Sequence, residues 1–106
     1  MEYDIKRGWY KNIEGDALAD LMREIFGNVN EDGDALVSSY GALVAIRVWV
    51  KDKSSMEIVT EAAKSPSDEE ILDTKRKLNL FTEKATGFNA KQRRDRAKKK
   101  AKDGTL

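Results

Sequence analysis

The chain has 106 residues, of which 40% are hydrophobic and 37% charged, with one proline and neither cysteine nor histidine. This length allows one compact domain with a single core, and the composition is too apolar for a wholly disordered chain. The missing residue types exclude disulfides, thiolate or imidazole zinc sites, cysteine nucleophiles and histidine-based catalytic triads.

The sequence carries no pattern typical of export, membrane insertion or phosphate-loop catalysis. No apolar run reaches the length of about 18 residues that a membrane span needs, and residues 1–4 lack the pattern of a signal peptide. No G-x-G-x-x-G or G-K-[ST] motif is present. We therefore expect a cytoplasmic protein that does not contact membranes, needs no cofactor or metal, and is not an enzyme.

The overall net charge of +1 conceals two unlike parts. Residues 88–106 hold eight basic side chains against two acidic ones, a net of +6, whereas residues 1–87 hold twelve basic and seventeen acidic ones, a net of −5. This segregation predicts a single folded domain over residues 1–88 and a basic C-terminal helix or disordered tail over residues 89–106. The basic residues of the tail are Lys91, Arg93, Arg94, Arg96, Lys98, Lys99, Lys100 and Lys102.

The first elements expected are a short edge strand over residues 3–6, a turn at Gly8, and a helix over residues 16–26. In the helix, the apolar residues recur at spacings that form one stripe, and Gly27 is placed to end it in the left-handed conformation. The charged residues of the helix fall off the stripe and should face water. The stripe consists of Leu18, Leu21, Met22 and Ile25.

The middle of the chain predicts a β-hairpin. A polar loop over residues 28–34 precedes two segments rich in valine, isoleucine and aromatics, at 35–40 and 42–51, which Gly41 separates. The second segment alternates between a wholly aliphatic face, which should meet the helices, and a mixed face. The aliphatic face consists of Val44, Ile46, Val48 and Val50.

A further strand at 56–60 and a long helix complete the predicted domain. Residues 61–64 can extend the strand or begin a helix, and Pro66 ends whatever precedes it. Ser67 and Glu70 form an S-x-x-E capping box that starts the helix, and Gly87 is its predicted end. Its buried stripe should be Ile71, Thr74, Leu78, Phe81, Ala85 and Phe88.

Asn89 and Gln92 form a second capping pair, so residues 90–102 are predicted to continue as a separate helix. Its apolar content is limited to three alanines, and its adjacent like charges oppose helix formation in isolation. We therefore expect it to fray unless a polyanion neutralises it. Together the elements predict an α+β fold, approximately β-α-β-β-β-α plus the basic segment, as a two-layer sandwich of antiparallel sheet and helices.

The sequence of residues 82–94 is Thr-Glu-Lys-Ala-Thr-Gly-Phe-Asn-Ala-Lys-Gln-Arg-Arg. It resembles the C-terminal signature of a small archaeal family of uncharacterised proteins, whose core is the Ala-Thr-Gly-aromatic-Asn-Ala-Lys run at residues 85–91. The resemblance implies an archaeal, cytoplasmic origin and a two-layer sandwich. It assigns no catalytic or binding residue.

The basic tail is the leading candidate for function, because clustered lysine and arginine gain affinity for nucleic acid by displacing counterions from phosphates. We therefore predict association with RNA, DNA or a ribonucleoprotein. A solvated extension that aids solubility, or contact with an acidic protein surface or with the negative face of the domain itself, would explain the same residues.

Arg47 and Trp49 share the mixed face of the second hairpin strand, where an aromatic ring and a guanidinium can stack on unpaired bases. The alternative for Trp49 is a core position or the anchor of a protein interface, which would make the protein an interaction module or a homodimer. A small-ligand binder would require a closed pocket between sheet and helices. The loop at residues 28–34 resembles a calcium loop, but Ser39 stands at the glutamate position, so an ordinary turn is expected.

Overall fold

The computed structural model describes residues 2–102, without the side chains of residues 100–102. Within that range, five strands form one antiparallel sheet in the order β1-β5-β4-β3-β2. The strands are β1 (Glu2–Asp4), β2 (Asn30–Asp32), β3 (Ala35–Tyr40), β4 (Leu43–Asp52) and β5 (Ser55–Ala62). The helices are η1 (Tyr10–Asn12, one turn), α1 (Ala17–Phe26), α2 (Asp68–Thr86) and α3 (Ala90–Lys102).

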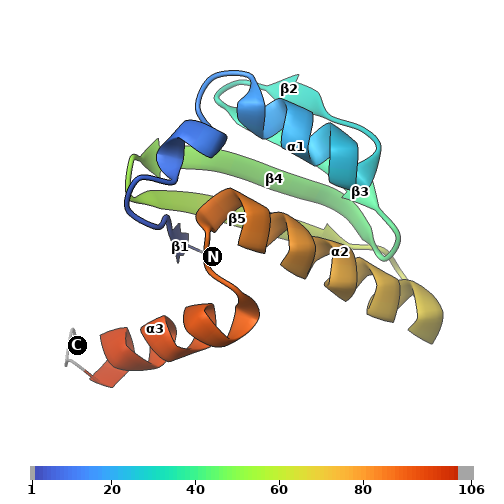
Figure 1. Ribbon diagram of the computed structural model, residues 1–106. Coiled ribbons are helices and arrows are strands. Elements are labelled where there is room, and N and C mark those ends of the chain that lie inside the picture. The colour runs from blue at the N-terminus through green and yellow to red at the C-terminus, as the bar shows by residue number, and fades with distance from the viewer. Residues whose placement is uncertain (1, 103–106) are drawn as a thin grey trace.

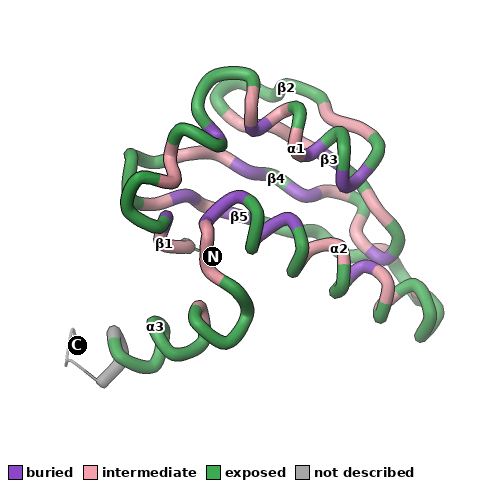
Figure 2. Tube along the Cα trace, viewed as in Figure 1, coloured by how far each residue is buried: buried purple, intermediate pink, exposed green. Residues whose placement is uncertain are grey.

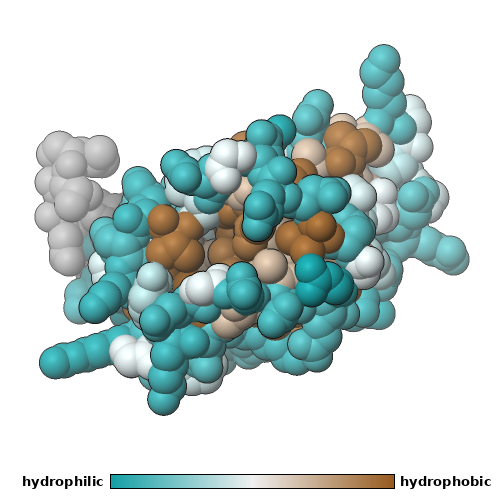
Figure 3. All heavy atoms as spheres, turned by 90° about the horizontal axis from the view of Figure 1, so that it is seen from above, coloured by the Kyte–Doolittle hydropathy of each residue, from teal (hydrophilic) through white to brown (hydrophobic). Residues whose placement is uncertain are grey.

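Helices α1 and α2 lie side by side on one face of the sheet, and α3 leaves the end of α2 at an angle (Figure 1). The predicted α+β sandwich is therefore confirmed. Seen from the side of α1 and β2, hydrophobic groups lie in separate patches among hydrophilic side chains (Figure 3).

Helix α1 follows its predicted pattern. Leu18, Met22 and Ile25 are buried, whereas the charged residues between them are exposed. Gly27 ends the helix with φ +84°, and its N–H donates to the carbonyl of Arg23. The spacing of the apolar stripe and the terminal glycine predicted this helix correctly, because both features depend only on residues within one or two helical turns.

The hairpin of β3 and β4 forms as predicted, and Ile46, Val48 and Val50 of its aliphatic face lie in or against the core, but Val44 does not. Ile46 and Val48 are fully buried under the helices, while Val44 is 53% exposed. The pairing of β4 with β5 shifts register between Leu43 and Ala45. This irregularity breaks the alternation, so Leu43 packs against the core and Val44 does not.

The polar loop predicted over residues 28–34 contains a strand. Residues 30–32 pair with β3 and form the edge of the sheet. Just before this strand, the Asn28 amide pairs with the backbone of Ser39, donating to its carbonyl at 2.8 Å and accepting from its N–H at 2.9 Å. The polar composition concealed β2 because an exposed edge strand needs no apolar alternation.

Helix α2 has both predicted ends. The Ser67 hydroxyl accepts from the Glu70 N–H at 3.2 Å, and the Glu70 carboxylate accepts from the Ser67 N–H at 3.2 Å. Gly87 closes the helix with φ +81°. On its buried side, the Thr74 hydroxyl accepts from the Ala42 N–H at 2.8 Å, which joins the helix to the turn of the hairpin.

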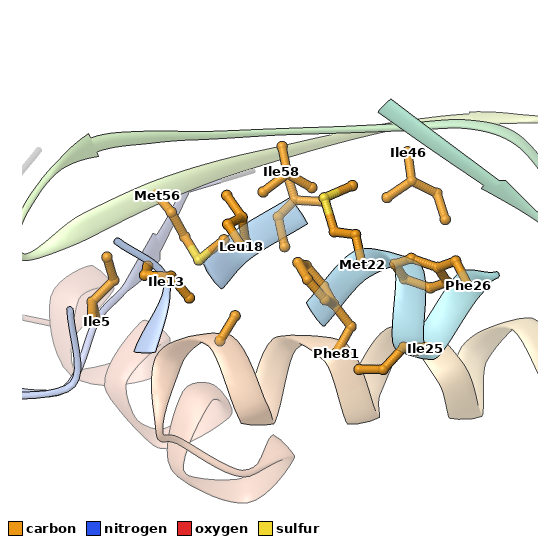
Figure 4. Packing of buried hydrophobic residues seen from close by; sticks show 12 residues of the cluster. Ile5, Ile13, Leu18, Met22, Ile25, Phe26, Ile46, Met56, Ile58 and Phe81 are labelled. Atoms are coloured by element: carbon orange, nitrogen blue, oxygen red, sulfur yellow. The ribbon is translucent and has the colours of Figure 1, made fainter. Parts of the chain in front are cut away.

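The core lies between the sheet and the two helices (Figure 4). Phe81 of α2 is fully buried, and its ring centroid lies 5.3 Å from that of Phe26 on α1. Met22, Ile46 and Met56 belong to the same core cluster and are fully buried. Phe81 therefore connects both helices to the sheet.

We expect Phe81→Ala to lower the free energy of unfolding by about 3–5 kcal/mol, because it removes a fully buried ring and leaves a cavity. Urea denaturation measures this change. Leu72→Ala is the matched control on the same helix, since Leu72 is 64% exposed and its loss should cost under about 1 kcal/mol. Equal losses in the two variants would contradict the packing described.

Candidate nucleic-acid interface

The junction between α2 and α3 is held by the segment that follows β1. The Trp9 indole N–H donates to the carbonyl of Lys84 at 2.8 Å, and the Lys6 N–H donates to the carbonyl of Thr86 at 2.8 Å. Gly87 packs under the Trp9 ring so closely that a Cβ there would lie 2.8 Å from Cδ2. These contacts fix the direction in which the chain leaves α2.

Helix α3 begins at the capping pair that the sequence indicated. The Asn89 side chain accepts from the Gln92 N–H at 2.9 Å, and the Gln92 side chain accepts from the Asn89 N–H at 2.9 Å. Only two residues separate the end of α2 from this cap. The start of α3 is therefore tied to a fixed point of the domain.

Two of the eight tail cations fasten α3 to the domain. Arg93 donates to the carbonyl of Phe88 at 2.6 Å and to the Asn79 side chain at 3.2 Å. Arg96 donates from Nε to the Asp4 carboxylate at 3.0 Å, and its guanidinium lies 4.5 Å from the centroid of the Phe88 ring. Partial burial lowers the pKa of Arg93, although an arginine stays charged at neutral pH.

These contacts explain why α3 is helical through Lys102 where fraying was expected. The arginines supply packing and ion pairing that the three alanines alone cannot. Contact with acidic residues of the domain itself was one of the alternatives for the tail, and Arg96 makes such a contact with Asp4. Apart from the half-buried Arg93, residues 90–99 of the helix are exposed (Figure 2).

The remaining described cations of α3 make none of these contacts, although Arg94 lines the groove between α3 and β1 together with Arg93 and Arg96. Lys91, Arg94 and Lys98 follow a 3-4 spacing, which puts them on one side of a helix, and Lys99 lies next to them. All four are exposed, and none forms an ion pair with the residues that the structure describes. The side chains of Lys100 and Lys102 lie outside the described part. We call Lys91, Arg94, Lys98 and Lys99 the outer α3 cations.

The structure places Arg47 and Trp49 on β4, where they alternate with the buried Ile46 and Val48 and so belong to the sheet face opposite the helices. Arg47 forms an ion pair with Asp32 of β2. Trp49 is half-buried and lies directly across from Glu57 of β5. This pair therefore has carboxylates as neighbours and forms a group separate from the outer α3 cations.

The Tyr40 side chain has a structural partner. Its hydroxyl hydrogen-bonds to the carboxylate of Asp73, and this bond raises the pKa of Tyr40. The contact joins β3 to α2. It gives Tyr40 a role in holding the helix on the sheet.

A second group of cations, which the sequence reasoning did not select, surrounds a hollow of about 810 Å³ beside α3. We call it the N-terminal cleft. Its charged lining residues are Lys6, Arg7, Lys11, Glu14, Lys53 and Arg96. The one available signal was the closely spaced basic residues at positions 6, 7 and 11 within an otherwise acidic domain.

A comparison with protein-family models matches residues 1–99 to a domain of unknown function, DUF5611. The chain belongs to the DUF5611 family. The DUF5611 match covers the sheet, α1, α2 and most of α3, and thus extends past residue 88. Comparisons with curated proteins and with solved structures found no match. Among the described residues, no helix is long and apolar enough to cross a membrane.

We expect Arg96→Gln to loosen α3 from the domain, because it removes both the ion pair with Asp4 and the contact with Phe88. The two contacts together contribute about 1 kcal/mol, so amide hydrogen exchange in α3 should accelerate by a factor of about five. Lys98→Gln removes the same charge from the same helix and should leave exchange unchanged. If hydrogen exchange accelerated equally in both variants, the loss of a positive charge, and not the loss of the contacts with Asp4 and Phe88, would determine the stability of α3.

Proposed function

We propose that this protein is a non-enzymatic nucleic-acid-binding protein whose outer α3 cations contact phosphates without reading sequence. The observation that supports the proposal is that the basic residues of α3 fall into two groups with different contacts. Arg93 and Arg96 hold the helix on the domain, and the four outer α3 cations stay exposed and without carboxylate partners among the described residues.

A helix held in this way favours binding to a polyanion. Cations on a fixed helix lose less conformational freedom on binding than cations on a disordered tail. Each phosphate that they neutralise releases a condensed counterion, which gives an affinity that falls steeply with salt. The acidic cluster of residues 68–70 lies at the far end of α2 from α3 (Figure 1), so it opposes binding little.

Several finer points belong to the same proposal. We infer a cytoplasmic location and an archaeal source, and we regard the run at residues 85–91 as a signature of the family. RNA, DNA and a ribonucleoprotein are all compatible partners, because phosphate contacts are common to the three.

The test is fluorescence anisotropy with labelled duplex DNA and with RNA across a salt series. Four to six phosphate contacts made by α3 should contribute about −4 to −5 to the slope of log affinity against log salt on the duplex. For the variant K91A/R94A/K98A, the slope should be shallower by about 2.7, since three contacts are lost. The control K64A/K75A/R76A removes the same charge from exposed residues before and within the first half of α2 and should keep the slope.

Two outcomes would overturn the proposal. One is a slope near zero for the full chain. The other is binding that is unchanged in a chain ending at Asn89, which lacks α3.

A second candidate is a protein-interaction module or homodimer that uses the sheet face around Trp49. The observation in its favour is exposed apolar surface on the strands, with Val59 43% and Val44 53% exposed. Self-association that persists in the chain ending at Asn89 would favour this candidate over the first.

A further inference from the structure

We propose that nucleic acid bound to α3 continues onto the domain, where its phosphates contact the N-terminal cleft. This inference rests on the proposed function and extends it, because it assigns phosphate contacts to residues outside the basic tail. The cations involved are Lys6, Arg7, Lys11 and Lys53, together with Arg96 from α3.

The cleft concentrates positive charge within an acidic domain. Residues 1–87 carry a net charge of −5, yet the cleft has five cations and Glu14 as its one carboxylate. Arg7, Lys11 and Lys53 are exposed, and none of them forms an ion pair with the described part of the chain. Because a concave surface of one sign raises the local concentration of counter-ions, this cleft favours an anionic ligand.

Backbone and side-chain contacts hold the walls of the cleft in place. The Ile5 N–H donates to the carbonyl of Ser54 at 2.8 Å, which joins the N-terminal segment to the turn between β4 and β5. In that turn, the Asp52 carboxylate accepts from the N–H and the hydroxyl of Ser54, both at 2.7 Å. These bonds lower the pKa of Asp52 and fix the turn that carries Lys53.

Lys6, which also lines the cleft, is held by separate contacts. Its ammonium lies 5.9 Å from the centroid of the Trp9 ring, and its backbone N–H is bonded to the end of α2. The contacts that set the direction of α3 therefore also place a cation of the cleft. A change at this junction would affect both surfaces together.

The cleft is continuous with the surface of α3. Phe88 and Arg96 line it, and the same two residues line the groove between α3 and β1. Arg96 uses Nε for Asp4, which leaves the four N–H groups on its terminal nitrogens. Arg96 therefore belongs both to α3 and to the lining of the cleft, and a strand that contacts both surfaces can contact Arg96 as well.

The form of the cleft favours a nucleic-acid backbone over a small phosphorylated ligand. Its cations come from the N-terminal segment, from η1, from the β4–β5 turn and from α3. Arg7, Lys11 and Lys53 are all exposed, whereas sites for small ligands bury most of the ligand surface. Dispersed, solvated cations match several phosphates in a row.

The experiment compares salt slopes for the full chain, for R7A/K11A/K53A, and for the charge-preserving R7K/K11R/K53R. We expect the alanine variant to bind duplex DNA with a slope shallower by about 2.7, and the charge-preserving variant to keep the slope of the full chain. K64A/K75A/R76A again controls for net charge. Thermal unfolding midpoints equal to that of the full chain show that the variants remain folded.

The outcomes separate this inference from the proposed function. If R7A/K11A/K53A keeps the full slope while K91A/R94A/K98A loses it, the cleft proposal fails and binding by α3 stands. If the full chain itself has a slope near zero, both fail. If the cleft variant loses affinity for inorganic pyrophosphate but keeps its slope on DNA, the cleft is a small-anion site and the proposal is overturned.

Discussion

The basic side of this molecule depends on how α2 ends. Gly87 adopts a left-handed conformation that a side chain would strain, and the Trp9 ring occupies the space where a Cβ would lie. The hydrogen bonds from Trp9 and Lys6 to the last turn of α2 lock the same point. A glycine, an indole and two carbonyl groups thus determine where α3 starts and where Lys6 lies.

The three-dimensional structure divides the charged residues differently from the sequence. The tail is not simply a set of eight equivalent cations, because Arg93 and Arg96 are engaged with Asn79, Phe88 and Asp4. The domain is not uniformly acidic either, since its N-terminal cations gather beside α3. Basic residues of the tail and of the N-terminal segment together form one basic corner of the molecule, and the rest of the domain is acidic.

What the sequence predicted well are features set by residues close together in the chain. The capping pairs that begin at Ser67 and Asn89, and the stripe that buries Phe81, need no knowledge of distant residues. Strand β2 pairs with the neighbouring β3 but lacks apolar alternation, whereas the displacement of Val44 and the N-terminal cleft depend on pairing or contacts between segments further apart in the chain. Residue spacing cannot reveal such pairing, and so neither the cleft nor the fastening role of Arg96 could be predicted.

The most direct test of a fixed α3 is the heteronuclear ¹H–¹⁵N NOE of the backbone amides at residues 90–99 in the full chain. We expect values equal to those of α2, because the Gly87 junction and the two arginines hold the helix on the domain. Low values that begin directly after Gly87, with α2 remaining rigid, would show an independent tail and contradict the fixed presentation of these cations.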